Sequence, residues 1–413
     1  MKLRTSSERR RLKYAATVND EALPEETDPD FQLQYVDIGN VDSEGAIHQI
    51  ANYRFADAPS RARRKVRDGD VIVSTVRTYL QAIAPIVEPP GNLIVSTGFA
   101  VVRPNKGILD AGFCKFALRE PKFLWEVQAR SVGVTYPAIN SSELQNIQIA
   151  MPAITKQKQI AKYLDAETAQ IDSLVSEKED MLRLLTQKRT TLISSLVTRG
   201  VDYNAKLKAT CVGWVDSIPT AWEMRRCANL FTEIDERNEP ELPLLNVSLN
   251  TGVTLRTFSD DRIESVAEDF ATYKVARKND LVANRMRFWQ GAVGIAPVDG
   301  LTSPDYMVAR MGKELLPAYV ELLFRTPQFS SEVKRYSHGM VDDRLRLYWD
   351  KFKTIRIPVP PIAEQRRIVE AVEREVKDIS EVEETLTQSI ALLKERRGAL
   401  IAAAVTGEIE VQG

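Results

Sequence analysis

Residues Met151–Asp165 read MPAITKQKQIAKYLD, and residues Val359–Glu373 read VPPIAEQRRIVEAVE. The second stretch aligns with the first without a gap, 208 positions further along the chain. The same offset aligns LLTQKRTTLISSLVT, from Leu184, with LLKERRGALIAAAVT, from Leu392. A period this long differs from the short repeats of solenoid proteins. It indicates two domain-sized halves that each end in the same segment.

Both repeated segments have the pattern of long amphipathic helices. Two matched stripes predict helices that bury each other as a coiled coil within one chain, whereas a single stripe would favour a helix packed on a domain core. The residues that recur every seven positions are Leu164, Ile171, Lys178, Leu185 and Leu192 in the first copy, and Val372, Ile379, Leu386, Leu393 and Leu400 in the second. We assign the alternate seam position to Ile160, Leu174 and Met181, and to Ile368 and Val382.

The segments before the helices are predicted to be variable domains of mixed secondary structure, so the fold class is α+β. We place a first variable domain at 1–150, a helical region at 151–203, a second variable domain at 204–358 and a second helical region at 359–413. Apolar runs bounded by turn residues predict short strands at 71–73, 93–95, 100–103, 244–249, 280–283 and 307–310. Short helices are expected at 112–118 and 318–323, and a loop at 211–224.

The composition excludes several classes of protein. The 413 residues carry 56 Lys and Arg against 57 Asp and Glu, so a polyanion would have to be held by a local patch. Three cysteines and two histidines are too few for a disulfide framework, and they make a zinc site or a histidine-centred active site unexpected. The chain has no apolar run of membrane-spanning length and no signal-peptide core, which predicts a cytoplasmic protein without a membrane span.

Sequence motifs of enzymes are also missing. The chain has no phosphate-binding GxxxxGK[ST], no GxGxxG, no nucleophile elbow and no HExxH. It also lacks the [DNS]PP[FYW] run of amino-methyltransferases. The acidic runs on the two helices suit solvated faces of a coiled coil. We therefore predict no catalytic residue and no metal ligand in this chain.

Basic and aromatic residues cluster within both variable domains. Guanidinium groups neutralise phosphates or bind guanine edges, and Asn or Gln can bind adenine, so the clusters suit DNA. A single Arg-rich loop is more often a solvated or ion-paired surface, but this one recurs beside the same strand in both halves. The candidate DNA-binding residues are Arg61, Arg63, Arg64, Lys65, Arg77 and Tyr79 in the first half, and Asn284, Arg285, Arg287, Trp289, Arg344 and Arg346 in the second.

The order of these parts resembles the specificity subunit family of type I restriction-modification enzymes. The resemblance covers essentially the whole chain and includes PPIAEQRRIV, the ending LLKERRGALIAAAVTGEIEV, and GWVDSIPTAWEMRR at the entry to the second variable domain. Two features depart from the pattern. The first copy has Lys156 where the second has Glu364, and the N-terminus has no copy of GWVDSIPTAWE.

The resemblance implies a function for the whole chain. Each variable domain would be a target recognition domain for half of a split, asymmetric site in double-stranded DNA, and the two helices would pack antiparallel as a spacer. The chain itself would not catalyse. It would dock two modification subunits that use S-adenosylmethionine, and restriction subunits that use ATP and Mg. The docking candidates are Gln157, Arg189, Gln365 and Arg397.

Two other classes of function remain as alternatives. A coiled-coil scaffold without DNA recognition would explain the heptads but not the duplicated basic loops. A methyltransferase or nuclease acting by itself would need motifs that the sequence lacks.

Overall fold

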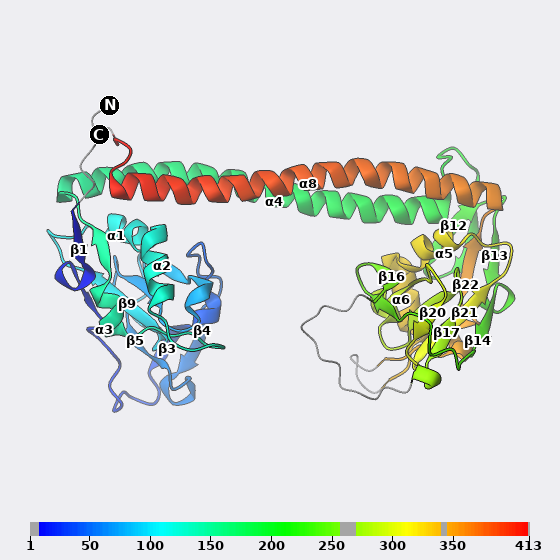
Figure 1. Ribbon diagram of the computed structural model, residues 1–413, viewed down its shortest axis with the longest axis horizontal. Helices are drawn as coiled ribbons and strands as arrows, with labels where there is room; N and C mark the ends of the chain where they lie inside the picture. Colours follow the sequence, from blue (N-terminus) through cyan, green and yellow to red (C-terminus); the bar gives the residue numbers. More distant parts are fainter. Residues whose placement is uncertain (1–7, 257–269, 340–344, 412–413) are drawn as a thin grey trace. The chain divides into compact units, whose positions relative to one another are not determined.

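A computed structural model describes residues 8–256, 270–339 and 345–411 of the chain (Figure 1). The chain divides into two compact units, one made of Met1–Glu179 with Thr387–Gly413, the other of Asp180–Leu386. Two long helices, α4 (Ile154–Arg199) and α8 (Ile362–Thr406), each contribute to both units. No helix in the described part of the chain is both long and apolar enough to span a membrane.

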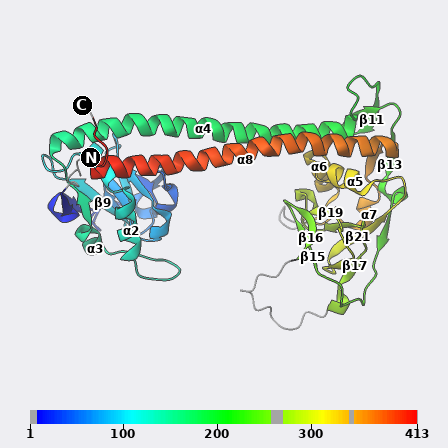
Figure 2. The ribbon, with the colours of Figure 1, turned by 45° about the horizontal axis from the view of Figure 1, so that its top comes forward.

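The described residues of the first unit form three short α-helices and two four-stranded sheets (Figure 2). The first sheet is antiparallel, in the order β2 (Ala16–Val18), β9 (Phe99–Pro104), β6 (Val71–Ser74) and β7 (Ile83–Pro85). The second has the order β4 (Ala51–Arg54), β3 (Gln32–Val36), β8 (Leu93–Ser96) and β5 (Ala62–Lys65), with β3 and β8 parallel. The remaining elements are β1 (Arg9–Arg11), which pairs with β10 (Gln148–Ala150), and the helices α1 (Ala111–Ala117), α2 (Pro121–Ala129) and α3 (Ser141–Asn146).

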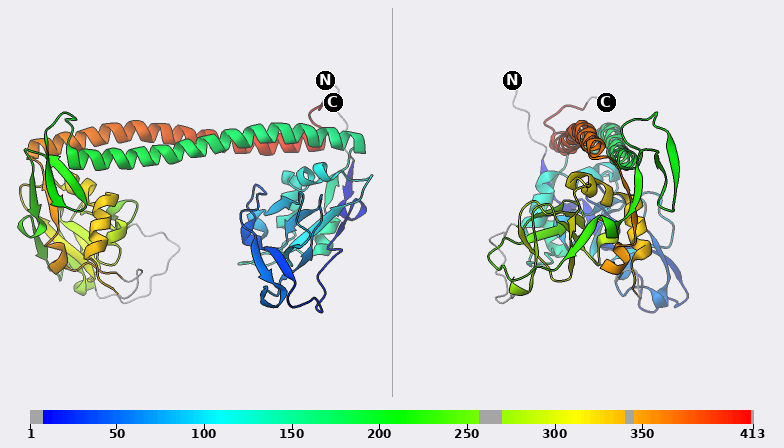
Figure 3. Two further views of the ribbon diagram at one scale, coloured as in Figure 1. Left: turned by 180° about the vertical axis from the view of Figure 1, so that it is seen from behind. Right: turned by 90° about the vertical axis from the view of Figure 1, so that its right-hand side faces the viewer.

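The second unit repeats this arrangement (Figure 3). Its four-stranded sheet has the order β14 (Phe231–Ile234), β21 (Tyr306–Met311), β18 (Leu281–Asn284) and β19 (Val293–Ile295). The counterpart of the second sheet consists of β16 (Gly252–Leu255) with β15 (Leu245–Ser248), and β20 (Gly300–Thr302) with β17 (Lys274–Ala276), joined by a parallel bridge from Leu244 to Leu301. Further elements of this unit are β13 (Glu223–Arg226), paired with β22 (Arg356–Val359), and α5 (Pro317–Phe324), α6 (Pro327–Tyr336) and α7 (Trp349–Phe352).

The apolar central strands explain the layers. In β6, Val71 and Val73 belong to the core beneath the helices, whereas Ile72 belongs to the core between the two sheets. In β18, Leu281 and Val282 divide in the same way. Successive side chains of a strand point to opposite faces, so a strand without polar alternation is buried on both sides. Each domain therefore has a layer of helices, a central sheet and an outer sheet.

The structure confirms the predicted α+β class, the two long helices, the six predicted strands and the two predicted short helices. The loop predicted at 211–224 is wrong, because most of it belongs to a hairpin of β11 (Leu207–Val212) and β12 (Val215–Pro219). Val215, Ile218 and Trp222 are buried in the core of the second unit. Gly213 and Pro219 concealed this apolar spacing, since both residues usually mark loops.

The helices pair antiparallel within each unit. In the first unit, Asp172 and Glu179 of α4 bind Arg397 and Lys394 of α8, so residue numbers rise along one helix as they fall along the other. Ile171, Ile379 and Leu386 are buried, as the seven-residue pattern predicts, whereas Leu164 and Val372 are buried in the cores of their own domains.

The predicted alternate seam position is wrong. Leu174 and Met181 are 46% and 52% exposed, and Val382 is 46% exposed. The inward position is one residue further along, where Val175 is buried and Leu182 and Glu383 are half-buried. One residue turns a helix by about 100°, which is enough to move a side chain from the seam to solvent. Ile160 and Ile368 are buried, but each belongs to the core of its own domain.

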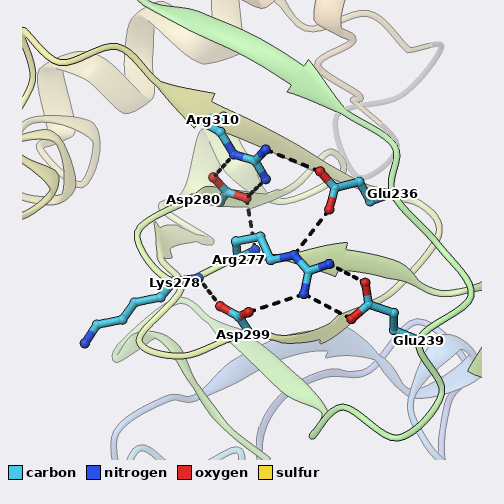
Figure 4. Close-up of polar contacts among 7 residues, drawn as sticks. All are labelled: Glu236, Glu239, Arg277, Lys278, Asp280, Asp299 and Arg310. Carbon is cyan, nitrogen blue, oxygen red and sulfur yellow. Dashed lines mark hydrogen bonds and ion pairs between the residues drawn. The ribbon is translucent and has the colours of Figure 1, made fainter.

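Each α/β domain contains the same ion-pair network beside its central strand. In the second unit the Arg310 guanidinium donates from Nε and Nη2 to Asp280, at 3.1 and 3.0 Å (Figure 4). Glu236 contacts both Arg310 and Arg277, and Arg277 also binds Asp299 and Glu239.

The first unit has the equivalent set of Arg103, Asp70, Glu21 and Arg67. Gly69 and Asn279 take positive φ values in the two equivalent turns, a conformation that glycine and asparagine tolerate best. Asp70 and Asp280 are nearly fully buried, so these paired carboxylates fix the start of β6 and of β18. The candidate DNA-binding loops leave the other ends of those strands.

Candidate nucleic-acid interface

In the first unit, the loop after β6 packs against the loop after α2. The Ile139 amide donates to the Thr75 carbonyl at 2.8 Å, and the Thr78 and Ser131 hydroxyls lie 2.8 Å apart. These bonds hold the 3-10 turn Thr78–Leu80, which follows Arg77. The Arg77 guanidinium lies 4.9 Å from the centre of the Tyr136 ring, and Tyr79 is 53% exposed. The result is a firmly held loop with a cation and two tyrosines at its surface.

The second unit has the same loop pair with different side chains. The Leu347 amide donates to the Arg285 carbonyl at 2.9 Å, as Ile139 does to Thr75. The loop then turns through Phe288–Gln290, and the Trp289 indole donates to the Met286 carbonyl at 3.0 Å. Lys334 of α6 lies 4.9 Å from the centre of the Trp289 ring.

Arg77 and Arg287 occupy equivalent positions in the two domains. Each follows by two residues the carbonyl that joins the two loops, and each is exposed. Their neighbours differ, because a tyrosine ring lies beneath Arg77 while Arg287 lies in a loop that also presents Met286 and Trp289. Two arginines at equivalent positions but with different neighbouring side chains suit two domains that bind different base sequences.

Asn284, Arg285 and Arg346 come together around this loop, but each has a partner within the chain. Asn284 donates to the Tyr306 hydroxyl at 3.3 Å, and Arg346 lies 3.7 Å from the Met286 sulfur. Arg285 forms an ion pair with Glu233 at 3.4 Å, and its buried Nε finds no partner among the described residues. Of the twelve candidates, Arg344 lies outside the described residues.

The basic run of the first unit forms a strand rather than a loop. Arg63, Arg64 and Lys65 belong to β5, which pairs with β8 on one side and is covered by residues 21–23 on the other. The Arg63 guanidinium lies 4.6 Å from the centre of the Phe55 ring, and burial lowers the pKa of Arg64. The expected loop is therefore a strand, and DNA contact by Arg63, Arg64 and Lys65 stays a prediction.

Arg61 differs from these three residues because it is exposed at the start of β5. Its carbonyl accepts from Thr97, and the neighbouring Gly98 carbonyl accepts from Thr75. These contacts place Arg61 at the end of the domain from which the loop after β6 extends.

Several side chains at these loops were not selected from the sequence. Val132, Val134 and Tyr136 are 79%, 101% and 61% exposed, although they are apolar or aromatic, and they lie in the loop that holds Arg77. Exposed apolar side chains that gather in one loop often mark a binding surface. The sequence SVGVTYP contains this signal, because its alternating apolar residues flank a glycine and a proline outside any predicted strand.

Gln157 and Gln365 attach the two long helices to their own domains. The Gln365 side chain accepts from the Leu316 amide at 2.7 Å and donates to the Glu314 and Pro360 carbonyls, both at 2.8 Å. Gln157 makes the equivalent three bonds to Asp110, Ile108 and Pro152. Both side chains are almost completely buried and fully hydrogen-bonded. The structure therefore does not support direct contact of either glutamine with another subunit.

Arg189 and Arg397 join the two helices within their respective units. Arg189 of α4 binds Glu383 and donates to the Ser380 hydroxyl at 2.9 Å, both on α8. Arg397 of α8 donates to both carboxylate oxygens of Asp172, at 2.8 and 3.2 Å. These two repeated arginines hold the helix pair together, and their contact with other subunits stays a prediction.

The two departures from the family pattern are explained by one difference between the units. In the second unit the Trp222 indole, from the segment GWVDSIPTAWE, donates to Glu364 at 2.8 Å. In the first unit, which has no such segment, Lys156 replaces the glutamate and donates to the Val411 carbonyl at 2.6 Å. Val411 is buried in the first core. The chain's C-terminal segment thus packs at the start of α4, where the second unit has Trp222 at the start of α8.

Comparison with known proteins agrees with this duplicated architecture. The profile of the type I restriction modification DNA specificity domain matches residues 66–182, from just before β6 into α4. The chain is 23% identical to the EcoKI specificity subunit of Escherichia coli K12, over 76% of this chain and 68% of the relative. It is 23% identical to the E. coli EcoBI specificity subunit, over 84% and 80%. The chain is therefore similar to type I restriction enzyme specificity subunits over most of its length, and residues 66–182 match their DNA specificity domain.

Solved structures show that the fold of these specificity subunits extends over the full chain. A structure from a study of complex assembly and conformational transition in a type I restriction-modification system covers 99% of this chain and 100% of its own, with a TM-score of 0.72 and 22% identity. The HsdS subunit of Thermoanaerobacter tengcongensis covers 99% of both chains, with a TM-score of 0.50 and 22% identity.

Among the described residues, no group of three His, Cys, Asp or Glu side chains could hold a metal ion.

Proposed function

We propose that this specificity subunit reads an asymmetric, two-part site in double-stranded DNA, one half with each α/β domain. The observation that carries the proposal is the repeated loop pair, in which Arg77 and Arg287 share a position while their neighbours differ. The two α/β domains share a fold but present different side chains in these loops. They therefore fit two different half-sites better than the two identical halves of a palindrome. The net charge of -1 fits a complex in which other subunits supply part of the phosphate contacts.

The duplication of the long helices supports a partner arrangement that is also duplicated. Two modification subunits, one for each repeat, would dock on the chain and use S-adenosylmethionine to methylate DNA. Restriction subunits using ATP and Mg would complete the assembly. In this proposal the chain contributes recognition and assembly and carries out no catalytic step.

Methylation mapping in cells that carry the full system tests this function. We expect one methylated sequence made of two unlike half-sites separated by a fixed number of unspecified bases. A continuous or palindromic methylated sequence would contradict the two-part assignment. Equal affinity of the assembled complex for random and methylatable duplexes, measured by gel shift, would favour a scaffold without DNA recognition.

A further inference from the structure

A basic pocket lies in the second unit beside the hairpin β11–β12. It has a volume of about 360 Å³ and is formed where the tip of the hairpin meets β13, β22 and the last turn of α6. Its cationic lining residues are Arg226 of β13, Arg356 of β22 and Arg335 of α6, and hydroxyls come from Thr210, Thr354 and Tyr336.

Two of these arginines face each other directly. Arg226 and Arg356 are cross-strand partners in the β13–β22 register, so their side chains leave the same face of the ribbon. Like charges at directly opposite positions destabilise an antiparallel pair. In the part of the chain that the structure describes, neither guanidinium has an acidic partner.

The acidic side chain that lines the pocket pairs with Arg335 rather than with Arg226 or Arg356. Arg335 has Glu332 at 3.4 Å, and Glu332 is the one carboxylate in the lining. Glu332 is also buried, and that burial raises its pKa. Three guanidinium groups form a donor-rich site of the kind that binds phosphate oxygens, whereas the Thr210 and Thr354 hydroxyls donate to the Val215 and Lys351 carbonyls.

The first unit offers a natural comparison, because the equivalent strands are β1 and β10. There Arg11 lies opposite Gln148, so the cross-strand position holds one charge instead of two. Position 129 of α2, which corresponds to Arg335, is an alanine. The three-arginine cluster therefore belongs to the second unit.

We propose that this pocket binds one backbone phosphate of the DNA, next to the half-site that the second domain reads. The inference rests on the proposed function. The last turn of α6 connects the pocket to the candidate DNA-binding loop after β18. Arg335 lines the pocket, and the adjacent Lys334 lies over Trp289 of that loop. A phosphate held between Arg226 and Arg356 would relieve their repulsion and fix the position of the duplex without reading its sequence.

The test is the salt dependence of DNA binding by the complex assembled with its modification subunits. Each neutralised phosphate contributes about -0.9 to the slope of log K against log salt, so R226Q/R356Q should reduce the slope by about 0.9. Affinity in 0.1 M salt should fall roughly eightfold, by the same relation. The ratio of affinities for the methylatable and random duplexes should stay the same.

The control is R10Q/R11Q, which removes two charges from the equivalent strand of the first unit. We expect this variant to keep the wild-type slope, and an equal fall in both variants would overturn the inference. A wild-type complex without preference for its site would contradict the proposed function. A wild-type preference combined with an unchanged slope in R226Q/R356Q would contradict the phosphate pocket alone.

Cys211 provides a second measurement that does not depend on affinity. It lines the pocket and is exposed, whereas the other two cysteines are buried. Binding of the duplex should slow alkylation of Cys211 in the wild-type complex, as followed by mass spectrometry, and should not slow it in R226Q/R356Q. Protection by millimolar inorganic phosphate but not by DNA would assign the pocket to a free anion, against the proposal. Protection by the modification subunits alone would assign it to an acidic protein surface, also against the proposal.

Discussion

At the scale of single residues, the two domains differ most where they are most exposed. The buried networks around Asp70 and Asp280 are nearly the same, and so are the bonds of Gln157 and Gln365. The side chains in the loops around Arg77 and Arg287 differ between the two domains. Buried polar groups are fixed by the need for hydrogen-bond partners, whereas exposed side chains can change without loss of the fold.

Replacement of Arg287 by alanine should relax selectivity at one half-site only. If Arg287 binds a base edge, its loss should cost about 1 to 3 kcal/mol on the cognate duplex and less on duplexes altered in that half-site. Arg77→Ala is the matched variant and should affect the other half-site. Binding to duplexes altered in one half at a time measures both effects, and loss of selectivity at both half-sites in either variant would disprove the assignment of one domain to each half.

Replacement of Gln365 by leucine should destabilise the second unit without altering which bases are read. The change removes the buried Gln365 amide group and leaves the partly buried Leu316 amide without its acceptor, which costs about 1 to 3 kcal/mol. Gln187→Leu is the control, because Gln187 is exposed on α4. Urea unfolding checks the prediction, and equal stability of the two variants would show that the glutamine contributes little.

At the scale of elements, the long helices were predictable because their pattern is repeated and periodic. The exact set of inward-facing positions was not predictable, because Leu174 and Val175 are adjacent and both apolar. The sequence pattern alone does not say which of the two points toward the other helix. The hairpin β11–β12 was missed because turn residues interrupt it. The strand β5 was interpreted as a loop because its arginines are unusual in a sheet, although neighbouring segments pair with it on both sides.

The candidate interface was predictable in part for the same kind of reason. Arg77, Arg287 and Trp289 could be found because basic and aromatic residues follow the same strand in both halves. The stacking of Arg77 on Tyr136 joins loops about sixty residues apart, and only the fold brings them together. The local sequence therefore identifies the loop after β6, which contains Arg77, but not the loop after α2, which contains Tyr136 and packs against it.

Replacement of Val411 by alanine should weaken the first unit selectively. Val411 is 4% exposed in the first core, and the loss of two methyl groups corresponds to about 1.6 kcal/mol. Val382→Ala is the control, because this valine is 46% exposed on α8. Hydrogen exchange should show faster exchange in the first unit alone. Unchanged exchange there would mean that the C-terminal segment does not stabilise the unit.

At the scale of the whole molecule, both long helices are continuous from one unit into the other. Seven residues inserted in each helix, after Glu179 and after Leu386, keep the heptad phase and add about 10.5 Å of helix. We expect the unspecified gap between the half-sites to grow by about three base pairs while both half-sites stay the same. Methylation mapping of the insertion variant measures the gap, and an unchanged gap with methylation intact would show that the helices do not set the spacing.

The division of the chain into units has a consequence for its synthesis. The second unit is one uninterrupted stretch, whereas the first needs residues from both ends of the chain. A ribosome that has released Leu386 has therefore supplied every residue of the second unit, while the first still lacks its part of α8 and Val411. The N-terminal domain is made first but is completed last, and until then its uncovered apolar surface is available to chaperones and proteases.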